Sequence, residues 1–410
     1  MKLLVVSQYF WPENFRINNL VSALSAEGVQ VEVLTGQPNY PQGRVFDGYR
    51  AWKFIKGIFN GVTIHRLPLV PRGSNSALFL ILNYLSFVAS GILFAPFALR
   101  RKKIDVIFVY APSPILQAIP AILLKWIKRA KLVVSVQDLW PESLEATGFV
   151  RNRVLLALVR VLVRWIYRHT DLILVQSKAF VDPVAALADR RKICYFPNSA
   201  DDVFSTPSAC SNCPIEGLEA GFSVVFAGNL GHAQSIETII DAAALLADAP
   251  DIRIYLVGDG SRTVWIQGEI QARNLKNVVM TGRYPSESMP AIMGRASALL
   301  ATLKDEPIFY HTIPSKIQTY LAAGRPLLAC MNGEGARIVM EANAGISCAA
   351  EDASSLAKAI KQLSSMSDLE RERMGQNGQQ YFKKHYDSNM LTRTLISHFE
   401  DVLTVRQDQK

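Results

Sequence analysis

Residues 313–326 read IPSKIQTYLAAGRP, and this stretch predicts a helix that leads directly into a strand. A Pro-Ser pair favours the start of a helix, a Gly-Arg-Pro run favours its end, and the apolar residues that follow read as a buried strand. The start of a helix presents unpaired backbone N–H groups and the positive end of its dipole, so it suits a phosphate group. Lys316, in the first turn, would add a mobile positive charge. The alternative is an ordinary amphipathic helix with a solvated lysine.

Both halves of the chain alternate short apolar strands with longer helical segments. Strands are expected at residues 3–7, 29–35, 62–66, 106–110, 132–136 and 172–175, and then at 223–227, 252–257, 278–281, 298–301 and 327–330. Continuous apolar strands separated by helices predict parallel sheets that are covered on both faces. The expected fold class is α/β, with two doubly wound sheets facing across a cleft and ligands at the carboxyl ends of the strands.

A loop-rich composition near residues 196–221 marks the boundary between the halves. We expect an N-terminal domain over residues 1–200, a linker over 201–220, a C-terminal domain over 221–386, and a final helix and polar tail over 387–410. A chain of 410 residues has room for two domains of ordinary size, each with its own core.

The composition narrows the class of partner. The chain is 50% hydrophobic and carries a net charge of +9, which suits nucleic acid, an anionic membrane surface or an anionic small substrate. We expect no nucleic acid, because no basic low-complexity tail or zinc-finger spacing is present. The five scattered cysteines fit a reducing compartment, and the Cys210-x-x-Cys213 pair reads more readily as a loop feature than as a zinc or redox site.

Residues 73–99 contain no charged side chain, so by length and composition they pass as a transmembrane helix. A full crossing is disfavoured because the flanking strands, near residues 62 and 106, are expected to be neighbours in one sheet. A hairpin or an in-plane insertion keeps that sheet intact, with basic residues on both sides near lipid headgroups. A buried pair of core helices is the alternative. We therefore expect contact with an anionic membrane surface.

A second segment agrees with membrane contact. In residues 151–168 four arginines share one helical stripe among almost entirely apolar residues, namely Arg153, Arg160, Arg164 and Arg168. Such a helix can bury its apolar surface while the arginines meet phosphate headgroups. A core helix with a solvated stripe is an equally good interpretation.

Polar and aromatic side chains gather in the loops that follow the predicted strands, where a cleft would bring them together. Carboxylate, amide and aromatic groups in such loops suit a polar, ring-shaped ligand such as a sugar. The residues of interest are Glu13, Arg16, Asn39, Asp138, Trp140, Glu142, Gly228, Asn229 and Gly258. For Asp138 an N-cap of the following helix is the alternative. No G-x-G-x-x-G follows the first strand, no Walker lysine motif occurs and no paired Asp-x-Asp ends a strand, so we expect neither a nicotinamide cofactor nor a catalytic metal.

The chain resembles the retaining glycosyltransferases of family 4, which have the GT-B architecture of two Rossmann-like domains. The motifs that carry the resemblance are YFWPE at 9–13, TGQPNYPQG at 35–43, DLWPES at 138–143, FPN at 196–198, AGN at 227–229, VGDG at 257–260 and PSK at 314–316. Together they span most of the chain. Within that family the chain is similar to bacterial enzymes of O-antigen, capsule and colanic-acid assembly, including N-acetyl-L-fucosamine transferases.

The resemblance implies a nucleotide-sugar donor, UDP-linked, in the C-terminal domain and a lipid-linked saccharide acceptor in the N-terminal domain. It implies a last helix that crosses back to the N-terminal domain, transfer with retention, and a place at the inner face of the cytoplasmic membrane. We assign catalytic roles to Asp138, Glu142 and Lys316. Donor binding is assigned to Gly228, Asn229, Gly258, Arg283, Ser315, Lys316 and Thr319, and acceptor binding to Glu13, Arg16, Asn39 and Trp140.

The sequence departs from the family pattern in the donor site. Many members carry two glutamates eight positions apart, and here those positions fall near His311 and Thr319. Many also grip the diphosphate with an Arg and a Lys where this chain has Asn229 and Gln234. Lys316 and Arg283 would then supply the positive charge. A nucleotide-sugar 2-epimerase and a non-catalytic sugar-binding module remain the rival interpretations.

Overall fold

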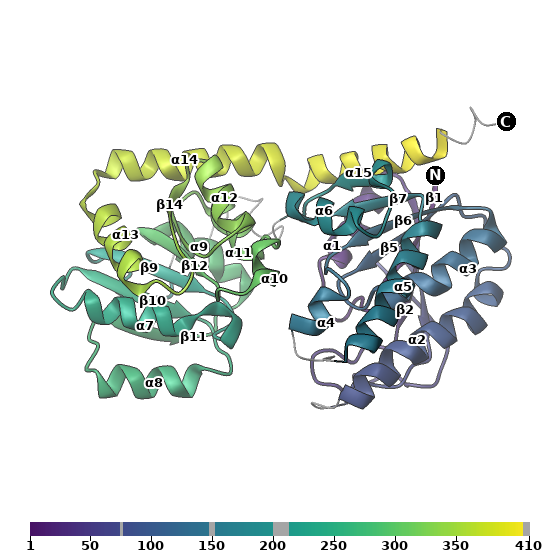
Figure 1. Cartoon of the computed structure of the whole chain (residues 1–410), viewed down its shortest axis with the longest axis horizontal. Coiled ribbons are helices and arrows are strands. Elements are labelled where there is room, and N and C mark those ends of the chain that lie inside the picture. Colours follow the sequence, from purple (N-terminus) through teal and green to yellow (C-terminus); the bar gives the residue numbers. More distant parts are fainter. Residues whose placement is uncertain (74–76, 147–151, 200–212, 405–410) are drawn as a thin grey trace. The chain divides into compact units, whose positions relative to one another are not determined.

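The structure, a computed structural model, describes residues 1–73, 77–146, 152–199 and 213–404. It divides the chain into two compact units, one formed by residues 1–196 and 389–410 and the other by residues 197–388. Each unit contains one sheet covered by helices on both faces (Figure 1). Most of the expected linker, residues 201–212, and the Cys210 position lie outside the described residues.

The first unit is built on an eight-stranded sheet. Across the sheet the order is β3 (Ile55–Phe59), β4 (Val62–Leu67), β2 (Gln30–Gly36), β1 (Lys2–Val6), β5 (Val106–Ala111), β6 (Lys131–Val136), β7 (Leu172–Val175) and β8 (Ile193–Tyr195). All neighbours pair in parallel except β3 and β4. The helices are α1 (Ile17–Ala26), α2 (Ala77–Ala98), α3 (Ala118–Lys128), α4 (Glu142–Ala146), α5 (Arg153–His169), α6 (Val181–Ala185) and α15 (Ser388–Thr404).

The second unit has a six-stranded, fully parallel sheet. Its order is β11 (Val278–Gly282), β10 (Ile252–Val257), β9 (Phe222–Ala227), β12 (Ala298–Thr302), β13 (Leu327–Cys330) and β14 (Gly345–Cys348). The helices are α7 (Ile236–Leu245), α8 (Thr263–Ala272), α9 (Met289–Arg295), α10 (Pro307–Tyr310), α11 (Ser315–Ala323), α12 (Glu334–Glu341), α13 (Ala353–Ser365) and α14 (Asp368–His385). The strand order reverses between β9 and β12, the place where such sheets bind ligands.

Alternation along the central strands explains why both faces of each sheet are covered. In β9, Val225 and Ala227 join the core on one face, while Val224 and Phe226 join the core on the other. Successive strand side chains point to opposite faces, so an uninterrupted apolar strand requires helices on both sides. The prediction of two doubly wound α/β sheets is confirmed.

Helix α15 returns to the first unit, as the fold prediction required. Leu391, Leu395 and Phe399 are buried in the core formed with β1, β5 and α1, and the Phe399 ring lies 5.4 Å from that of Phe108. A final helix that follows the second unit in sequence therefore completes the core of the first.

One expectation about the first sheet is wrong. The strands near residues 62 and 106 are not neighbours, because β2 and β1 lie between β4 and β5. They do belong to the same sheet, and the segment between them is one continuous helix, α2, rather than a hairpin or a pair of helices.

Candidate active site

Helix α11 begins and ends where the sequence predicts. Pro314 caps its start, and Gly324 at its end has φ +72°, a left-handed conformation that favours glycine. Ser315 is exposed, but the Lys316 side chain turns toward the sheet. Its Nζ donates a hydrogen bond to Oε1 of Gln234 at 2.7 Å and lies 3.4 Å from the centre of the Phe226 ring. The structure thus fixes the ammonium group at the carboxyl end of β9.

Gly228 leaves room for this lysine. A Cβ atom at position 228 would stand 2.8 Å from Cε of Lys316, and the residue has φ +133°. Burial beside Gly228 and Phe226 lowers the pKa of Lys316 to about 7. A bound anion would favour the charged form and raise this pKa, so the residue is well placed to respond to a phosphate group.

The lowered pKa of Lys316 predicts how stability depends on pH. Between about pH 7 and the ordinary lysine pKa, the unfolded chain holds a proton at position 316 that the folded protein has released. The free energy of unfolding should therefore rise with pH across this window. We expect Lys316→Met, which keeps the aliphatic stem, to remove that rise, whereas Lys276→Met at an exposed lysine should keep it. Melting temperatures measured from pH 6 to about pH 10 would check this. Identical pH profiles for Lys316→Met and the wild type would contradict the burial of the ammonium.

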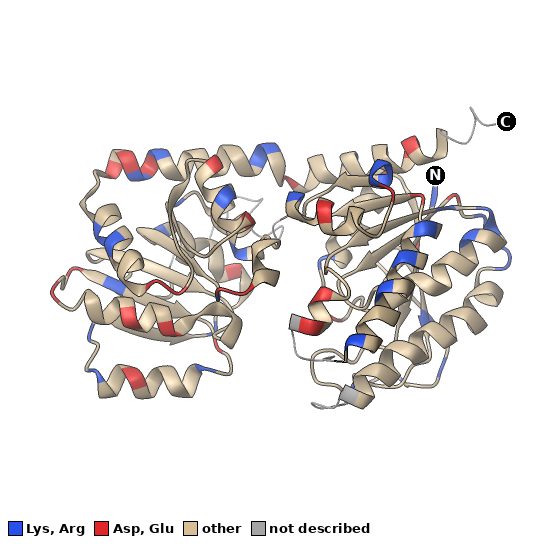
Figure 2. Ribbon diagram, in the orientation of Figure 1, with Lys and Arg blue, Asp and Glu red and all other residues tan. Residues whose placement is uncertain are grey.

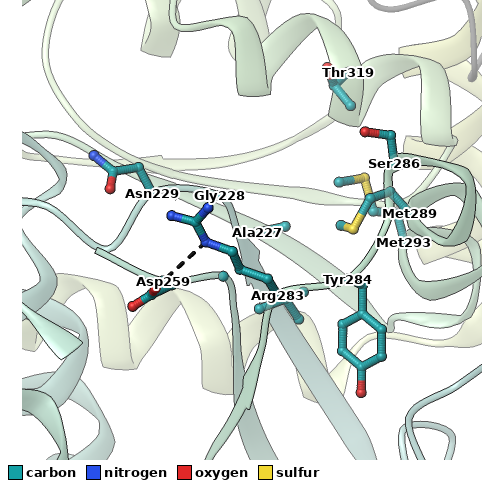
Figure 3. A pocket seen from close by; sticks show the side chains of 12 residues that line it. Ala227, Gly228, Asn229, Asp259, Arg283, Tyr284, Ser286, Met289, Met293 and Thr319 are labelled. Atoms are coloured by element: carbon teal, nitrogen blue, oxygen red, sulfur yellow. Dashed lines mark ion pairs between the residues drawn. The ribbon is translucent and has the colours of Figure 1, made fainter. Parts of the chain in front are cut away.

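A cavity of about 360 Å³ opens at the carboxyl ends of β9, β10 and β11 (Figure 3). Five predicted donor-binding residues line it, namely Gly228, Asn229, Gly258, Arg283 and Thr319. Ser315 and Lys316 do not line it, but the Lys316 side chain packs against Gly228, which does. The structure therefore brings most of the predicted donor site into one concave surface.

The floor of the cavity consists of backbone. A Cβ atom on Gly258 would lie 1.9 Å from the carbonyl oxygen of Gly228, and Gly258 has φ +141°. Both the space and the conformation therefore require glycine at the ends of these neighbouring strands. The absence of side chains lets the backbone of Gly258 pack directly against that of Gly228 at the cavity.

Arg283 supplies a second cation. Its Nε lies 3.6 Å from Oδ2 of Asp259, and its side chain is largely exposed. Figure 3 shows the guanidinium directed toward Gly228 and Asn229. Hydrogen bonds from Thr263 and the amide of Gly260 lower the pKa of Asp259, so this carboxylate stays ionised beside the arginine.

Sequence reasoning missed one wall of the cavity. Tyr284 and Ser286 follow β11, and Met289 and Met293 lie four residues apart on α9. The signal was present in the i, i+4 spacing of the methionines, but such a pair is equally typical of a core helix. These side chains offer an apolar surface next to the polar strand ends.

Asp138 follows β6 in the first unit. It is half-buried, and burial raises its pKa to about 6. The N-cap alternative is wrong, because the next helix, α4, begins only at Glu142. A carboxylate with this pKa accepts a proton readily near neutral pH, which suits a general base.

Glu142 and Arg16 occupy more open positions in the first unit. Glu142 is half-exposed and its carboxylate lies 3.8 Å from the guanidinium of Arg160 on α5. Arg16 is half-buried directly before α1. Asp138, in the loop after β6, and Glu142, the first residue of α4, thus belong to the first unit, whereas Lys316 and the predicted donor-binding residues belong to the second.

Three of the residues predicted to bind the acceptor, Glu13, Asn39 and Trp140, are buried and contact other parts of the first unit. The Glu13 carboxylate is buried and accepts hydrogen bonds from the amides of Phe10, Asn39 and Tyr40 at 3.2, 2.8 and 2.7 Å. Burial raises the pKa of Glu13 to about 7, against the lowering effect of these bonds. Asn39 is also buried, and its Oδ1 accepts a hydrogen bond from the Arg72 amide at 3.0 Å.

Trp140 requires a similar correction. Its ring is 5% exposed and packs in the core of the first unit, so a sugar does not reach its face. Within the motifs of the first unit, the exposed aromatic side chains are instead those of Trp11 and Tyr40. Arg72, which sequence reasoning did not consider, lies 5.0 Å from the centre of the Tyr40 ring. Glu13, Asn39 and Trp140 therefore shape the loops rather than face a ligand.

Among the described residues, no group of three or more His, Cys, Asp or Glu side chains could hold a metal ion. The cysteines described, Cys194, Cys213, Cys330 and Cys348, are all free thiols.

Two family models match the chain in succession. The "Glycosyl transferase 4-like domain" covers residues 14–199, and "Glycosyl transferases group 1" covers residues 221–366. Together they cover most of each unit. The chain belongs to the family 4 glycosyltransferases with GT-B architecture.

Individual proteins agree with this assignment. The chain is 26% identical over 344 residues to the putative colanic acid biosynthesis glycosyl transferase WcaI of Escherichia coli, covering 79% of this chain and 82% of that protein. It is 27% identical over 300 residues to the probable glycosyltransferase WbjE of Pseudomonas aeruginosa, covering 69% and 73% respectively. The crystal structure of Anabaena HepE in complex with UDP matches with a TM-score of 0.71 at 16% identity, covering 98% of this chain and 100% of that one. At this level of identity, the match to HepE shows a shared fold and no more.

Proposed function

We propose that the protein transfers a sugar from a UDP-linked donor to a lipid-linked saccharide in the assembly of a surface polysaccharide, with retention. The observation that carries this proposal is the position of the Lys316 ammonium beside Gly228, at the edge of a cavity lined by strand ends. One relative is named for colanic acid biosynthesis, which supports a role in polysaccharide assembly. A structural neighbour solved with UDP supports uridine as the base of the donor. An N-acetylated deoxyhexosamine is the sugar that the family resemblance favours.

The chemistry requires stabilisation of a departing diphosphate. Cleavage of the bond between the anomeric carbon and the diphosphate oxygen builds negative charge on the leaving group and positive charge on the sugar ring. We assign the stabilisation of that negative charge to Lys316 at the carboxyl end of β9, to Arg283 after β11 and to the positive end of the α11 dipole. We propose that these groups perform this task without a metal cofactor.

The acceptor hydroxyl must lose a proton as it attacks. Asp138, with its raised pKa, is the residue we assign to that step, and Glu142 to positioning the acceptor. Retention requires the acceptor to approach the face of the sugar from which the diphosphate leaves. The acceptor belongs to the membrane, and we place the protein on the cytoplasmic side of that membrane, attached at its surface.

A donor-binding and transfer experiment tests the proposal. UDP and UDP-sugars should raise the melting temperature of the wild type by mass action, and a UDP-sugar with a soluble acceptor analogue should give an α-linked product from an α-linked donor. We expect the rate to be unchanged by EDTA. Formation of an epimeric nucleotide-sugar without any acceptor would favour the epimerase instead. Ligand binding with neither transfer nor donor hydrolysis would favour a sugar-binding module.

A further inference from the structure

The outer face of α2 is unusually apolar for a surface helix. Its 22 residues include no charged side chain, and Phe97 is 78% exposed. Other large apolar side chains exposed along the same helix are Leu78, Phe79, Ile81, Leu82, Leu85, Ile92, Leu93 and Phe94. By length and composition the segment Leu78–Ala98 could span a membrane.

The inner face of α2 is fastened to the first unit by buried polar groups. The Asn83 side chain is fully buried, accepts a hydrogen bond from Gln8 Nε2 at 2.7 Å and donates one to the carbonyl of Val70 at 2.6 Å. Ser86 accepts a hydrogen bond from the Val70 amide at 2.9 Å. Further along, Gly91 packs closely against Pro120 of α3. One side of α2 is therefore packed against, and hydrogen-bonded to, the rest of the first unit.

The topology also excludes a crossing in this fold. Helix α2 connects β4 to β5, and both strands belong to the same sheet. The two ends of α2 therefore remain on the same side of any membrane. An exposed apolar face on such a helix can enter a bilayer only sideways, with the helix axis along the surface.

The apolar surface continues onto α3 and α5. Helix α3 packs against both α2 and α5 (Figure 1). Its last turn exposes Trp126 and Ile127. On α5, Val154, Leu158 and Val161 are exposed at i, i+4, i+7 spacing, so they form one stripe. We call the exposed side chains of α2, of the last turn of α3 and of α5 the α2–α5 face.

Basic side chains border this face. The exposed arginines of α5 are Arg153, Arg160, Arg164 and Arg168, and Figure 2 shows a row of basic positions along that helix. At 100° per residue they lie directly beside the Val154–Leu158–Val161 stripe. Four more, at residues 100–103, follow the end of α2, where Lys128 holds the backbone through carbonyls of Arg100 and Lys102.

We propose that the α2–α5 face docks on a bilayer that contains acidic phospholipids, with α2 lying in the plane of the interface. This rests on the proposed function, because a lipid-linked acceptor must be met at a membrane. Apolar side chains bordered by arginines match acyl chains bordered by phosphate headgroups. A second copy of the chain is a poorer occupant, because the dimer would bring two basic borders together.

Vesicle flotation tests the lipid partner. The wild type should float with vesicles of phosphatidylglycerol and phosphatidylcholine, and less at high salt or with phosphatidylcholine alone. We expect Leu93→Asp with Phe97→Asp to reduce the bound fraction about tenfold or more. The matched control is Val264→Asp with Leu369→Asp, two apolar residues of the second unit that are 81% and 76% exposed, and it should float like the wild type.

A second readout separates this proposal from the enzyme assignment. Transfer to a soluble acceptor analogue should be unchanged in Leu93→Asp with Phe97→Asp, because neither residue belongs to the proposed catalytic or binding groups. If that variant floats like the wild type, the face is not the docking site. If the wild type fails to float and instead forms a dimer that the variant abolishes, the occupant is a second copy and the proposal is overturned.

The orientation of α2 has its own test. Alkaline extraction should release the protein from membranes, and brominated phospholipids should quench fluorescence in the wild type more than in Trp126→Phe. Resistance to alkaline extraction would show a crossing segment and overturn the in-plane arrangement. Equal quenching in both proteins would show that Trp126, at the end of α3, does not contact the bilayer.

Discussion

Replacing Lys316 with methionine is expected to lower kcat/KM about 10²- to 10³-fold while the protein stays folded. The methionine preserves the packing over Phe226 but removes the only side-chain ammonium that the structure places beside Gly228 among the described residues. Loss of one group that stabilises charge in a transition state typically has an effect of this size. Steady-state transfer rates, together with a melting curve, measure both parts of the expectation.

The pH dependence adds a sharper criterion. Since the pKa of Lys316 is about 7 in the free protein, donor binding above pH 7 should take up a proton. Affinity for UDP should therefore decline as pH rises through this value in the wild type, and the decline should be absent in Lys316→Met. Lys276→Met, at an exposed lysine, serves as the control. Wild-type turnover in Lys316→Met would remove this residue from the mechanism.

Asp138→Asn is the second substitution with a large expected effect. If Asp138 takes the acceptor proton, the amide should lower kcat by about 10²- to 10⁴-fold with little change in donor affinity. In the wild type the rate should rise with pH through about 6, because only the ionised carboxylate is a base and burial raises its pKa to that value. A pH profile of kcat/KM checks both statements.

Glu142→Gln gives the comparison for Asp138. Glu142 follows Asp138 closely in sequence, as the first residue of α4, but it is half-exposed and lies beside Arg160. As a positioning residue it should mainly raise the KM for the acceptor and leave the acid limb of the pH profile in place. If Asp138→Asn retains the limb near pH 6 and Glu142→Gln loses it, the two roles must be exchanged.

The central strands were predictable because their signal is local. Leu172–Val175 is continuously apolar, and Ile252–Val257 is apolar except for the exposed Arg253. Both runs lie between helical segments, and their predicted bounds agree with the structure. The missed strands carry weaker signals. Ile55–Phe59 is an edge strand interrupted by Gly57, Ile193–Tyr195 has three residues, and Gly345–Cys348 begins with glycine. The expectation that β4 lies beside β5 was wrong because strand order across a sheet depends on crossover connections, which no local sequence pattern specifies.

The residues that line the cavity of the second unit were more predictable than the side-chain packing of the first unit, for a physical reason. Glycines at strand ends and a lysine at a helix start act through backbone geometry, which sequence position largely determines. Whether Glu13 or Trp140 faces a ligand depends on side-chain packing between distant segments. The backbone amides of Asn39 and Tyr40 donate hydrogen bonds to the Glu13 carboxylate, and the Trp140 ring packs in the core. The same limit applies in the second unit, where the hydrogen bond between Gln234 and Lys316 joins positions 82 residues apart and no local pattern predicts it.

Helix α15 has a practical consequence for anyone who wishes to study the halves in isolation. A protein ending before residue 389 would expose the apolar groove that Leu395 and Phe399 fill, so the N-terminal half should aggregate or unfold when produced alone. Supplying residues 389–410 as a fused or separate peptide should rescue its solubility. The C-terminal half, contiguous in sequence, needs no such complement.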